Sequence, residues 1–397
     1  MVIVNIEDFF HPNAGYQINI LSKYLTKFGH KVYIVTSELD LIPDFLTSFF
    51  GKNNIDELDR KFEKNTGVKI IRLPVLKYIS GRVIFKKNLI SVIKKINPDI
   101  IYAHGNDTFN GINLIVNYKK NGIPLITDNH MLEMASKNPF NKIFRLFYRL
   151  FIKPIILKHN IKVIKTQKDD YVNRCLGIPN NLTPWISYGS DTMLFHPNLI
   201  VKQNFRKEYD ILKDELVFVY TGKLDESKGG LLLANAIKNK IFAKKRPIFV
   251  IVGNAIGEYG KKVENLLSTS ENRVIRFQTQ HYEKLSYFYQ IADIALFPKQ
   301  CSLSFYDAQA CGCPVLSENN NINIDRNSHN NGWTFEQNDV YDFIMKIRMI
   351  CDMPDQLLDE VSNNALNFIK CNYNYEDKAR EYEDIIIKEI YAKRKEK

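Results

Sequence analysis

Long apolar runs, paired cysteines and targeting signals are all scarce in this 397-residue sequence. No stretch of about 18 uncharged apolar residues occurs, which argues against a transmembrane helix. The first ten residues, MVIVNIEDFF, lack a basic region and include two acids, so we expect no cleaved signal peptide and a cytoplasmic location. The six cysteines show no CxxC spacing, which predicts reduced thiols and no structural zinc.

Several catalytic and nucleotide-binding motifs are also missing. The loop HPNAG (11–15), which follows the first apolar run, is not the GxGxxG of dinucleotide-binding folds. The sequence has no GxxxxGK[ST], GxSxG, HExxH or EF-hand pattern, which argues against dehydrogenases, kinases and hydrolases. No zinc finger, RRM or helix-turn-helix signature occurs, so we expect no nucleic-acid partner.

The sequence is basic, with a formal net charge of +11. An excess of this size indicates an anionic partner such as a phosphorylated ligand or an anionic lipid. The richness in Lys, Asn and Ile fits AT-rich coding equally well, so charge alone does not decide between the two explanations.

Short apolar runs alternate with amphipathic stretches in the first half of the chain. The run VIVNI precedes a turn, a helix expected over 16–28 that ends at Gly29, and the run VYIVTS. The run VKIIRLP precedes a stretch expected to be helical up to Ile96, and three more runs follow: DIIYAHG, IPLITDNH and IKVIKTQ. Buried strands that alternate with helices are typical of a parallel, doubly wound sheet.

The same alternation starts again after Pro197, with the runs LVFVYTG, PIFVIVG, VIRFQT, DIALFP and CPVLSE. We therefore expect an α/β fold of two Rossmann-like parallel-sheet domains that face each other across a cleft. The expected boundaries are an N-terminal domain over 1–190, a C-terminal domain over 191–372 and a final helix over 373–397 that packs back on the N-terminal domain. The linker is ISYGSDTMLFHPNLIV.

The segment VFVYTGKLDESKGG combines a strand end with basic residues. Its strand ends at Gly222, and Lys223 and Lys228 follow where a loop meets a helix. Two ammonium groups beside helix N-terminal amides suit a diphosphate, whose charge they would neutralise. The alternative is a lysine-rich surface turn.

The sequence resembles the retaining glycosyltransferases of family four, which have the GT-B fold. The resemblance covers nearly the whole chain and is carried by six motifs in the family's order: HPNAG, PDIIYAHG, IPLITDNH, ISYGSDTMLFHPN, TGKLDESKGG and DAQACGCPVL. Each motif is weak by itself, and their order makes the resemblance specific.

On the donor side, the resemblance implies that Gly222, Lys223 and Lys228 hold the diphosphate and that Asp307 accepts hydrogen bonds from the nucleotide ribose. Lys299, or Cys301 in a shorter alignment, replaces the first glutamate of the family's paired-glutamate motif. Neither supplies a carboxylate, which puts the identity of the sugar in question. Two hydroxyls could serve the phosphate or the sugar, or could cap the following helix; they belong to Ser302 and Ser304.

On the acceptor side, the resemblance implies that Gly15 approaches the donor phosphate and that His130 is the active-site histidine. Four further residues are expected to line the acceptor side or orient that histidine: Tyr16, Gly105, Asn106 and Glu133. Tyr188 replaces the asparagine that is usual in the family's linker.

The stretch PFNKIFRLFYRLFIKPIILK (139–158) is both basic and apolar. Its basic residues fall on one stripe of a helix, at Lys142, Arg145, Arg149 and Lys153. Such a helix could lie on an anionic membrane with its arginines at the headgroups. The alternative is an ordinary helix packed on the N-terminal sheet with a solvated basic edge.

The resemblance implies transfer of a hexosyl unit from a UDP-sugar or GDP-sugar to a hydroxyl of a glycan or lipid-linked acceptor, with retention of configuration. We expect no metal requirement, because Lys223 and Lys228 would stabilise the departing diphosphate. Two alternatives remain: a catalytically degenerate GT-B subunit that binds a partner or a glycan, and a nucleotide-sugar epimerase on the same fold.

Overall fold

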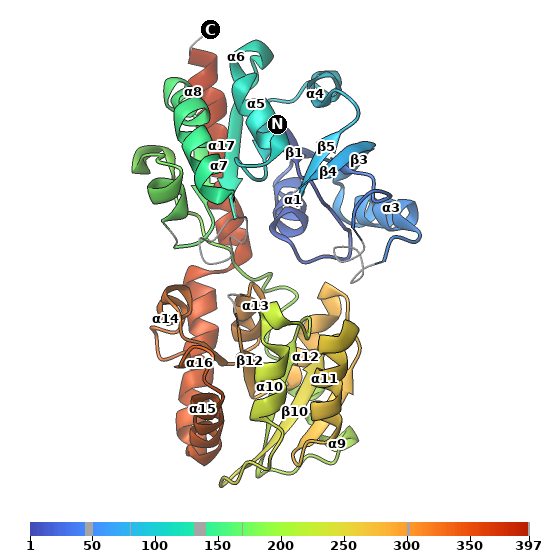
Figure 1. The fold of residues 1–397 in the computed structure, drawn as a ribbon, viewed down its shortest axis with the longest axis vertical. Helices are drawn as coiled ribbons and strands as arrows, with labels where there is room; N and C mark the ends of the chain where they lie inside the picture. Colours follow the sequence, from blue (N-terminus) through green and yellow to red (C-terminus); the bar gives the residue numbers. More distant parts are fainter. Residues whose placement is uncertain (44–50, 80, 131–139, 169, 300–301, 396–397) are drawn as a thin grey trace. The chain divides into compact units, whose positions relative to one another are not determined.

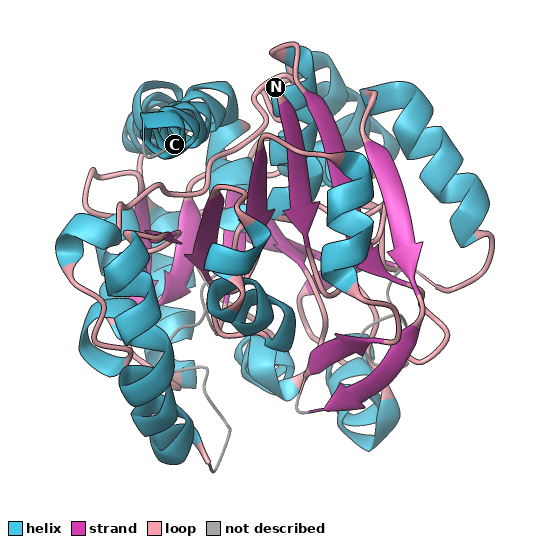
Figure 2. Cartoon of the chain, turned by 90° about the horizontal axis from the view of Figure 1, so that it is seen from above, coloured by secondary structure: helices cyan, strands magenta, loops and turns pink. Residues whose placement is uncertain are grey.

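The computed structural model describes residues 1–43, 51–79, 81–130, 140–168, 170–299 and 302–395. The chain divides into two compact units (Figure 1). Unit 1 comprises Met1–Tyr188 and Glu376–Lys397, and unit 2 comprises Gly189–Tyr375. Each unit has a six-stranded parallel sheet. Figure 2 shows strands flanked by helices. The predicted α/β fold of two parallel-sheet domains is therefore confirmed.

The sheet of unit 1 has the strand order β3-β2-β1-β6-β7-β8. Ile3 in the central strand lies opposite Val32 on one side and Ile100 on the other. Successive strands are added to one side of β1 up to β3 and to the other side from β6 onward, so the strand order reverses between β1 and β6. The loops after these two strands diverge there and leave room for a ligand. The strands are β1 (Val2–Ile6), β2 (Lys31–Ser37), β3 (Lys69–Leu73), β6 (Ile100–Ala103), β7 (Leu125–Asn129) and β8 (Lys162–Lys165).

Side chains cap the first turns of α4 (Leu89–Ile96) and α5 (Phe109–Val116) in unit 1. The side chain of Thr108 accepts a hydrogen bond from the amide of Gly111 at the start of α5, and Asn88 caps α4 in the same way. The helix expected over 16–28 is present and slightly shorter. These helices are α1 (Gln17–Lys27), α3 (Ile55–Thr66), α4 (Leu89–Ile96), α5 (Phe109–Val116), α6 (Tyr118–Asn121), α7 (Asn141–Phe147), α8 (Lys153–His159) and α17 (Tyr375–Lys395).

Two local predictions in unit 1 were wrong. The stretch between VKIIRLP and Ile96 is not all helical, because an antiparallel hairpin of β4 (Val75–Ile79) and β5 (Arg82–Phe85) precedes α4. The single helix expected over 139–158 is interrupted by a π-helical turn, Tyr148–Ile152, between α7 and α8. Pro154, near the start of α8, lacks the amide that a regular helix would use, which fits a break at this point.

Unit 2 repeats the topology of unit 1, with the strand order β11-β10-β9-β12-β13-β14 and its reversal between β9 and β12. Its strands are β9 (Glu215–Thr221), β10 (Arg246–Val252), β11 (Arg273–Phe277), β12 (Ile294–Phe297), β13 (Val315–Glu318) and β14 (Gly332–Phe335). Its helices are α9 (Leu199–Glu208), α10 (Gly230–Ala236), α11 (Gly257–Ser268), α12 (Leu285–Ile291), α13 (Ser304–Ala310), α14 (Asn321–Arg326), α15 (Val340–Asp352) and α16 (Asp355–Asn372).

The last helix, α17, belongs almost wholly to unit 1. Tyr382, Ile386 and Ile390 are buried along it, and the hydroxyl of Tyr382 accepts a hydrogen bond of 2.5 Å from the side-chain Nε2 of Gln17 in α1. The expectation that the final helix packs on the N-terminal domain is therefore confirmed. Among the described helices, none combines the length and the apolar character that crossing a membrane requires.

Candidate functional site

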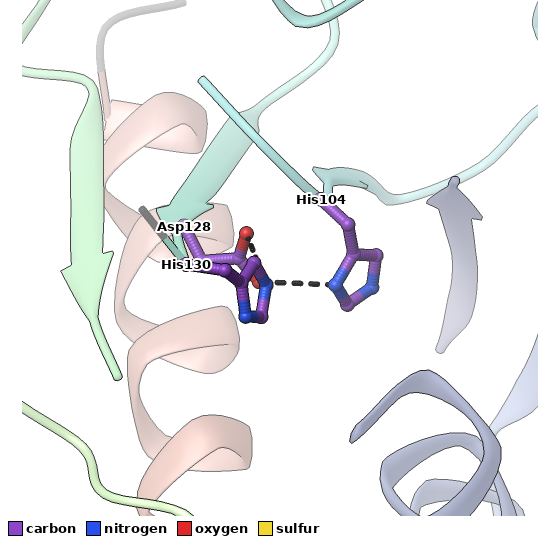
Figure 3. A group of neighbouring side chains, drawn as sticks. All are labelled: His104, Asp128 and His130. Atoms are coloured by element: carbon purple, nitrogen blue, oxygen red, sulfur yellow. Dashed lines mark ion pairs between the residues drawn. The ribbon is translucent and has the colours of Figure 1, made fainter. Parts of the chain in front are cut away.

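Unit 1 gathers polar side chains at the carboxyl ends of its central strands. Glu7 follows β1, His104 follows β6, and His130 follows β7. This is the edge where the reversal of strand order leaves room for a ligand. His104 and His130 approach Asp128, near the end of β7, from two directions (Figure 3).

Asp128 is the centre of this group. Its buried carboxylate forms ion pairs with His104 Nδ1 at 3.0 Å and with His130 Nε2 at 2.9 Å. It also accepts hydrogen bonds from the Tyr102 hydroxyl at 2.7 Å and the Gly105 amide at 2.8 Å. Burial opposes its charge, but the two imidazoles outweigh this and hold the pKa of Asp128 well below its usual range.

His130 has protein partners on both ring nitrogens. Nε2 contacts Asp128, and Nδ1 hydrogen-bonds the hydroxyl of Tyr188. Burial works against the imidazolium, but the charge of Asp128 raises the pKa of His130 well above its ordinary value. Tyr188, which departs from the family's linker pattern, thus fixes the orientation of the imidazole. The ring is 36% exposed, so its carbon edge still reaches the surface of unit 1.

The same three residues could be considered as metal ligands, because one ligand atom from each of His104, Asp128 and His130 lies within 4.8 Å of the others. These atoms already pair with one another in the structure, and Asp128 accepts two further hydrogen bonds. The contacts that the structure shows for this group are those of an ion-pair network that orients His130.

Glu7 is a residue that the sequence reading missed. It lies immediately after β1, and its Oε1 accepts a hydrogen bond of 2.9 Å from the Asp8 amide. Burial raises the pKa of Glu7 to about 7, although the nearby histidines, His104 foremost, act in the opposite direction. An acid directly after a buried strand was the available signal.

The other residues expected on the acceptor side differ in their exposure and in their contacts. Tyr16 precedes α1 and its ring is 43% exposed, beside Phe9. Gly15, the preceding residue, is half-buried. Gly105 has a φ of +89° and donates its amide to Asp128. Glu133 lies outside the described residues.

Asn106 is engaged inside unit 1. Its side chain is fully buried, donates to the Tyr148 hydroxyl at 2.6 Å and accepts from Asn129 at 2.6 Å. Its amide donates to the backbone carbonyl of Asp128 at 2.9 Å. These bonds tie the loop after β6 to the end of β7, so Asn106 holds the loops that carry His104 and His130.

Unit 2 has its own group of loops, at the reversal between β9 and β12. Gly229 in the loop after β9 packs so closely on the loop after β12 that an added Cβ would lie 3.0 Å from the Lys299 Cβ. The backbone at Gly253 and Gly222 is closer still, since a Cβ on Gly253 would lie 1.8 Å from the Gly222 carbonyl oxygen. Glycine is required here because another residue would force the strand ends apart.

Lys223 and Lys228 border this loop, and both are half-buried. The Lys223 carbonyl accepts a hydrogen bond of 2.6 Å from Tyr220. The Lys228 amide donates to Asp225 Oδ1 at 3.0 Å, and the Ser227 hydroxyl donates to the same oxygen at 2.7 Å. Asp225, which the sequence reading did not single out, thus shapes the turn that presents both lysines.

Asp307 is buried in α13. Its Oδ1 accepts hydrogen bonds from the Ser190 hydroxyl at 2.7 Å and the Tyr282 hydroxyl at 3.4 Å. Burial raises the pKa of Asp307 to about 7, although both hydrogen bonds lower it. The carboxyl is therefore half-protonated near neutral pH, and ionisation leaves it a stronger acceptor.

The remaining donor-side residues lie in the loop between β12 and α13. Ser302 Oγ accepts a hydrogen bond of 3.3 Å from the Ser304 amide, which is a capping contact. Cys301 lies outside the described residues. Glu318, at the end of β13, is a buried carboxylate near Lys299, and the sequence reading missed it too.

The burial of Glu318 raises its pKa, while the Asn338 amide at 3.0 Å and the charge of Lys299 lower it. A carboxylate thus lies close to the loop from which the family's first glutamate is missing. Its signal in the sequence was an acid that directly follows the buried run PVLS.

Known proteins match this chain in two consecutive parts. The profile of the family described as Glycosyltransferase Family 4 matches residues 14–161, and that of Glycosyl transferases group 1 matches residues 201–368. The first range contains Gly15 and His130, and the second contains Lys223, Lys228 and Asp307.

Curated relatives match shorter stretches. A lipopolysaccharide 1,2-N-acetylglucosaminetransferase of Salmonella typhimurium is 29% identical over 127 residues, which cover 29% of this chain and 33% of that protein. A D-inositol 3-phosphate glycosyltransferase of Segniliparus rotundus is 28% identical over 137 residues, which cover 32% and 30% of the two chains. The chain thus spans about a third of the length of these curated relatives.

Solved structures share the fold over almost the whole chain. A glycosyltransferase from Rickettsia africae has a TM-score of 0.74 at 16% identity and covers 98% of each chain. Anabaena HepE, in complex with UDP and glucose, has a TM-score of 0.73 at 14% identity, with 98% of this chain and 100% of that one covered. This likeness shows the GT-B fold, and the two family profiles, over residues 14–161 and 201–368, show that the chain belongs to the family-four glycosyltransferases.

Proposed function

We propose that this protein transfers a hexosyl unit from a nucleotide diphosphate sugar, UDP-linked or GDP-linked, to a hydroxyl of a glycan or lipid-linked acceptor. The observation that carries the proposal is the loop after β9, where Lys223 and Lys228 lie beside the strand-order reversal of unit 2. Ligands of open α/β sheets bind at such a reversal, and two cations there suit a diphosphate.

In this proposal the departing diphosphate is neutralised by Lys223 and Lys228. Their ammonium groups would take the role that a divalent cation has in other sugar transferases, so we propose that no metal is required. The Gly222–Gly253 approach leaves no side chain between strand ends and ligand. Asp307 then offers a carboxyl to the ribose.

His130 supports the acceptor half of the proposal. Its imidazole is held by Asp128 and Tyr188 at the edge of unit 1, so it can present a polarised C–H edge and a positive charge to a sugar or phosphate. We propose retention of anomeric configuration, with the leaving phosphate assisting attack from the same face. Analysis of the first-formed product by NMR tests this point, and an inverted anomer would contradict it.

The setting that we propose is synthesis of a bacterial surface polysaccharide or glycoconjugate, on the cytoplasmic side of the cell membrane. It rests on the relative that acts on lipopolysaccharide and on the basic charge of the chain. A lipid-linked acceptor would bring the protein to that surface as a peripheral enzyme.

Nucleotide binding tests the donor site directly. Calorimetric titration with UDP, GDP and ADP, with and without EDTA, should identify one nucleotide that binds regardless of EDTA. Lys228→Ala should weaken that binding by about 10- to 100-fold, since a charge-assisted contact contributes about 1.5–3 kcal/mol. Lys213→Ala is the matched control, because Lys213 is exposed just before β9, at the other end of the strand.

The second candidate is a catalytically degenerate subunit that binds a partner or a glycan. Lys299 favours it, because this side chain stands beside Gly229 where the family has a sugar-binding glutamate. If no nucleotide binds and Lys228→Ala behaves like the wild type, the transferase proposal is wrong and this candidate replaces it.

A further inference from the structure

The segment 140–159 of unit 1 carries large apolar side chains on its solvent-exposed side. Six of them recur at helical spacing over α7, the π-helical turn and α8, and are called the apolar face below. They are Ile143, Leu146, Phe147, Leu150, Phe151 and Leu157, with exposed fractions of 68, 59, 42, 59, 61 and 39%. A contiguous apolar surface of this kind marks an interaction site.

The apolar face is not the side by which the segment packs on its own unit. That role belongs to Tyr148, Ile152 and Ile156, which are at most 1% exposed and lie in the core of unit 1. The ring centroids of Phe147 and Phe151 lie 5.5 Å apart, so the two rings contact each other. The segment therefore has two apolar sides. One packs in the core of unit 1, and the other is the exposed apolar face.

The stretch of sequence that contains the apolar face carries charge of one sign. Residues 134–168 include nine Lys and Arg residues and no Asp or Glu. Lys142 and Lys158 are exposed beside the apolar face. An anionic surface would complement this charge, and each basic side chain near it would add to the attraction.

Both arginines of this segment contact the rest of unit 1, whereas we expected them to reach lipid headgroups. Arg149 Nε donates to the Cys175 carbonyl at 3.0 Å, and its guanidinium also bonds the Arg174 carbonyl. The guanidinium of Arg145 lies over the Tyr171 ring, 5.3 Å from its centroid. Both side chains thus hold the segment against the π-helical turn Tyr171–Cys175.

We propose that the apolar face inserts into the headgroup–acyl boundary of an anionic lipid leaflet, with Lys142 and Lys158 at the headgroups. Apolar burial supplies the insertion and the lysines supply the preference for anionic lipid. The inference rests on the proposed function in one respect only. Membrane binding would serve to bring the enzyme to a lipid-linked acceptor. A second copy of this chain fits less well, because a symmetric contact would bring two basic segments together.

Vesicle co-sedimentation tests the proposal with the full chain and no sugar. The wild type should bind vesicles of phosphatidylglycerol and phosphatidylcholine, and bind pure phosphatidylcholine more weakly. The double variant Leu150→Asp/Phe151→Asp should lower binding to the anionic vesicles by at least about tenfold, because two charges replace inserting groups. Lys142→Glu/Lys158→Glu should reduce the preference for anionic vesicles.

The matched control is Leu212→Asp/Phe242→Asp, which alters an exposed Leu and an exposed Phe of unit 2, at 54 and 73% exposure. Equal binding by the two double variants would overturn the proposal, as would a wild type that binds neither vesicle. Sedimentation velocity tests the remaining alternative, which is a dimer of this chain. A wild-type dimer that Leu150→Asp/Phe151→Asp converts to a monomer would show that the apolar face joins two copies.

The readout is separate from the donor site. Leu150→Asp/Phe151→Asp should leave nucleotide affinity unchanged, and an unaltered urea transition of Trp185 would show that unit 1 of the variant is folded. Vesicle binding without nucleotide binding would leave the membrane proposal standing and remove the transferase. Nucleotide binding without vesicle binding would leave the transferase proposal standing and remove the membrane proposal.

Discussion

Units 1 and 2 have the same strand order, yet the loops at their strand-order reversals differ in chemistry. In unit 1, a buried carboxylate, Asp128, is paired with two imidazoles. In unit 2, the backbones of Gly222 and Gly253 nearly touch, and half-buried lysines border the loop. The comparison shows that the topology fixes where a site forms, while the loop residues decide whether charge or backbone shape builds it.

The largest expected effect comes from removing the central charge of unit 1. Asp128→Asn leaves His104 and His130 without their shared anion, and loss of one partner from a buried pair costs about 3–5 kcal/mol. Urea unfolding can be followed in unit 1 alone, because unit 1 contains Trp185 and unit 2 contains Trp333. With Trp333→Phe as background, the unfolding midpoint should fall.

Asp170→Asn is the control for that experiment. Asp170 is also in unit 1 and also forms an ion pair, with Arg174, but it is 64% exposed. Exposed pairs contribute about 0–1 kcal/mol, so this variant should unfold like the wild type. A similar loss in both variants would mean that the buried network is not what stabilises unit 1.

The corresponding experiment in unit 2 alters the packing of the backbone without altering any charge. Gly253→Ala places a Cβ 1.8 Å from the Gly222 carbonyl oxygen, so the ends of β9 and β10 must separate. We expect a loss of about 3 kcal/mol or more from the stability of unit 2, seen through Trp333 in a Trp185→Phe background.

Gly257→Ala separates crowding from backbone strain. Gly257 also has a positive φ, +69°, but an added Cβ there meets nothing within 4 Å. It should cost only about 1–2 kcal/mol, the strain of the left-handed conformation. If the two alanine variants unfold alike, the close approach of Gly222 and Gly253 does not matter.

A smaller effect should appear as pH dependence in unit 2. The folded-state pKa of Asp307, about 7, lies above its ordinary value of 3.8, so the folded state binds the proton more tightly than the unfolded state. Stability from this group is therefore present at low pH and lost as pH rises from about 4 to about 7. Asp307→Asn should remove that slope.

The measurement is the urea midpoint of the Trp333 signal between pH 4 and pH 8. Asp214→Asn is a suitable control, since Asp214 is 58% exposed. Asp128 should give the opposite sign in unit 1, because its pKa is lowered and its stabilisation disappears only as pH falls. A wild-type slope that survives in Asp307→Asn would contradict the assignment.

The sequence predicts the fold well, because each buried strand and each amphipathic helix leaves a local pattern. It failed at the β4–β5 hairpin, where short strands of mixed burial resemble a polar helix. It also missed the π-helical turn, since one inserted helical residue barely alters the apolar spacing.

The site is less predictable from sequence because its bonds join distant residues. Motifs in the sequence singled out Lys223, Lys228, His130 and Asp307. Ser190, which bonds Asp307, lies 117 positions away, and nothing local marks the pair. Tyr188 illustrates the same limit, because its departure from the family pattern was visible while its bond to His130 was not.

The route of the chain through α17 has a practical consequence for dissecting the protein. Unit 2 is one continuous stretch, Gly189–Tyr375, inserted between two pieces of unit 1. Within unit 2, the amide of Ser190 bonds the Tyr373 carbonyl at 2.8 Å and the amide of Tyr375 bonds the Ser190 carbonyl at 2.9 Å, so both ends of the insert lie side by side. Unit 2 can therefore be excised or circularised as a single gene fragment, whereas unit 1 needs its two fragments rejoined by a short graft between Tyr188 and Glu376.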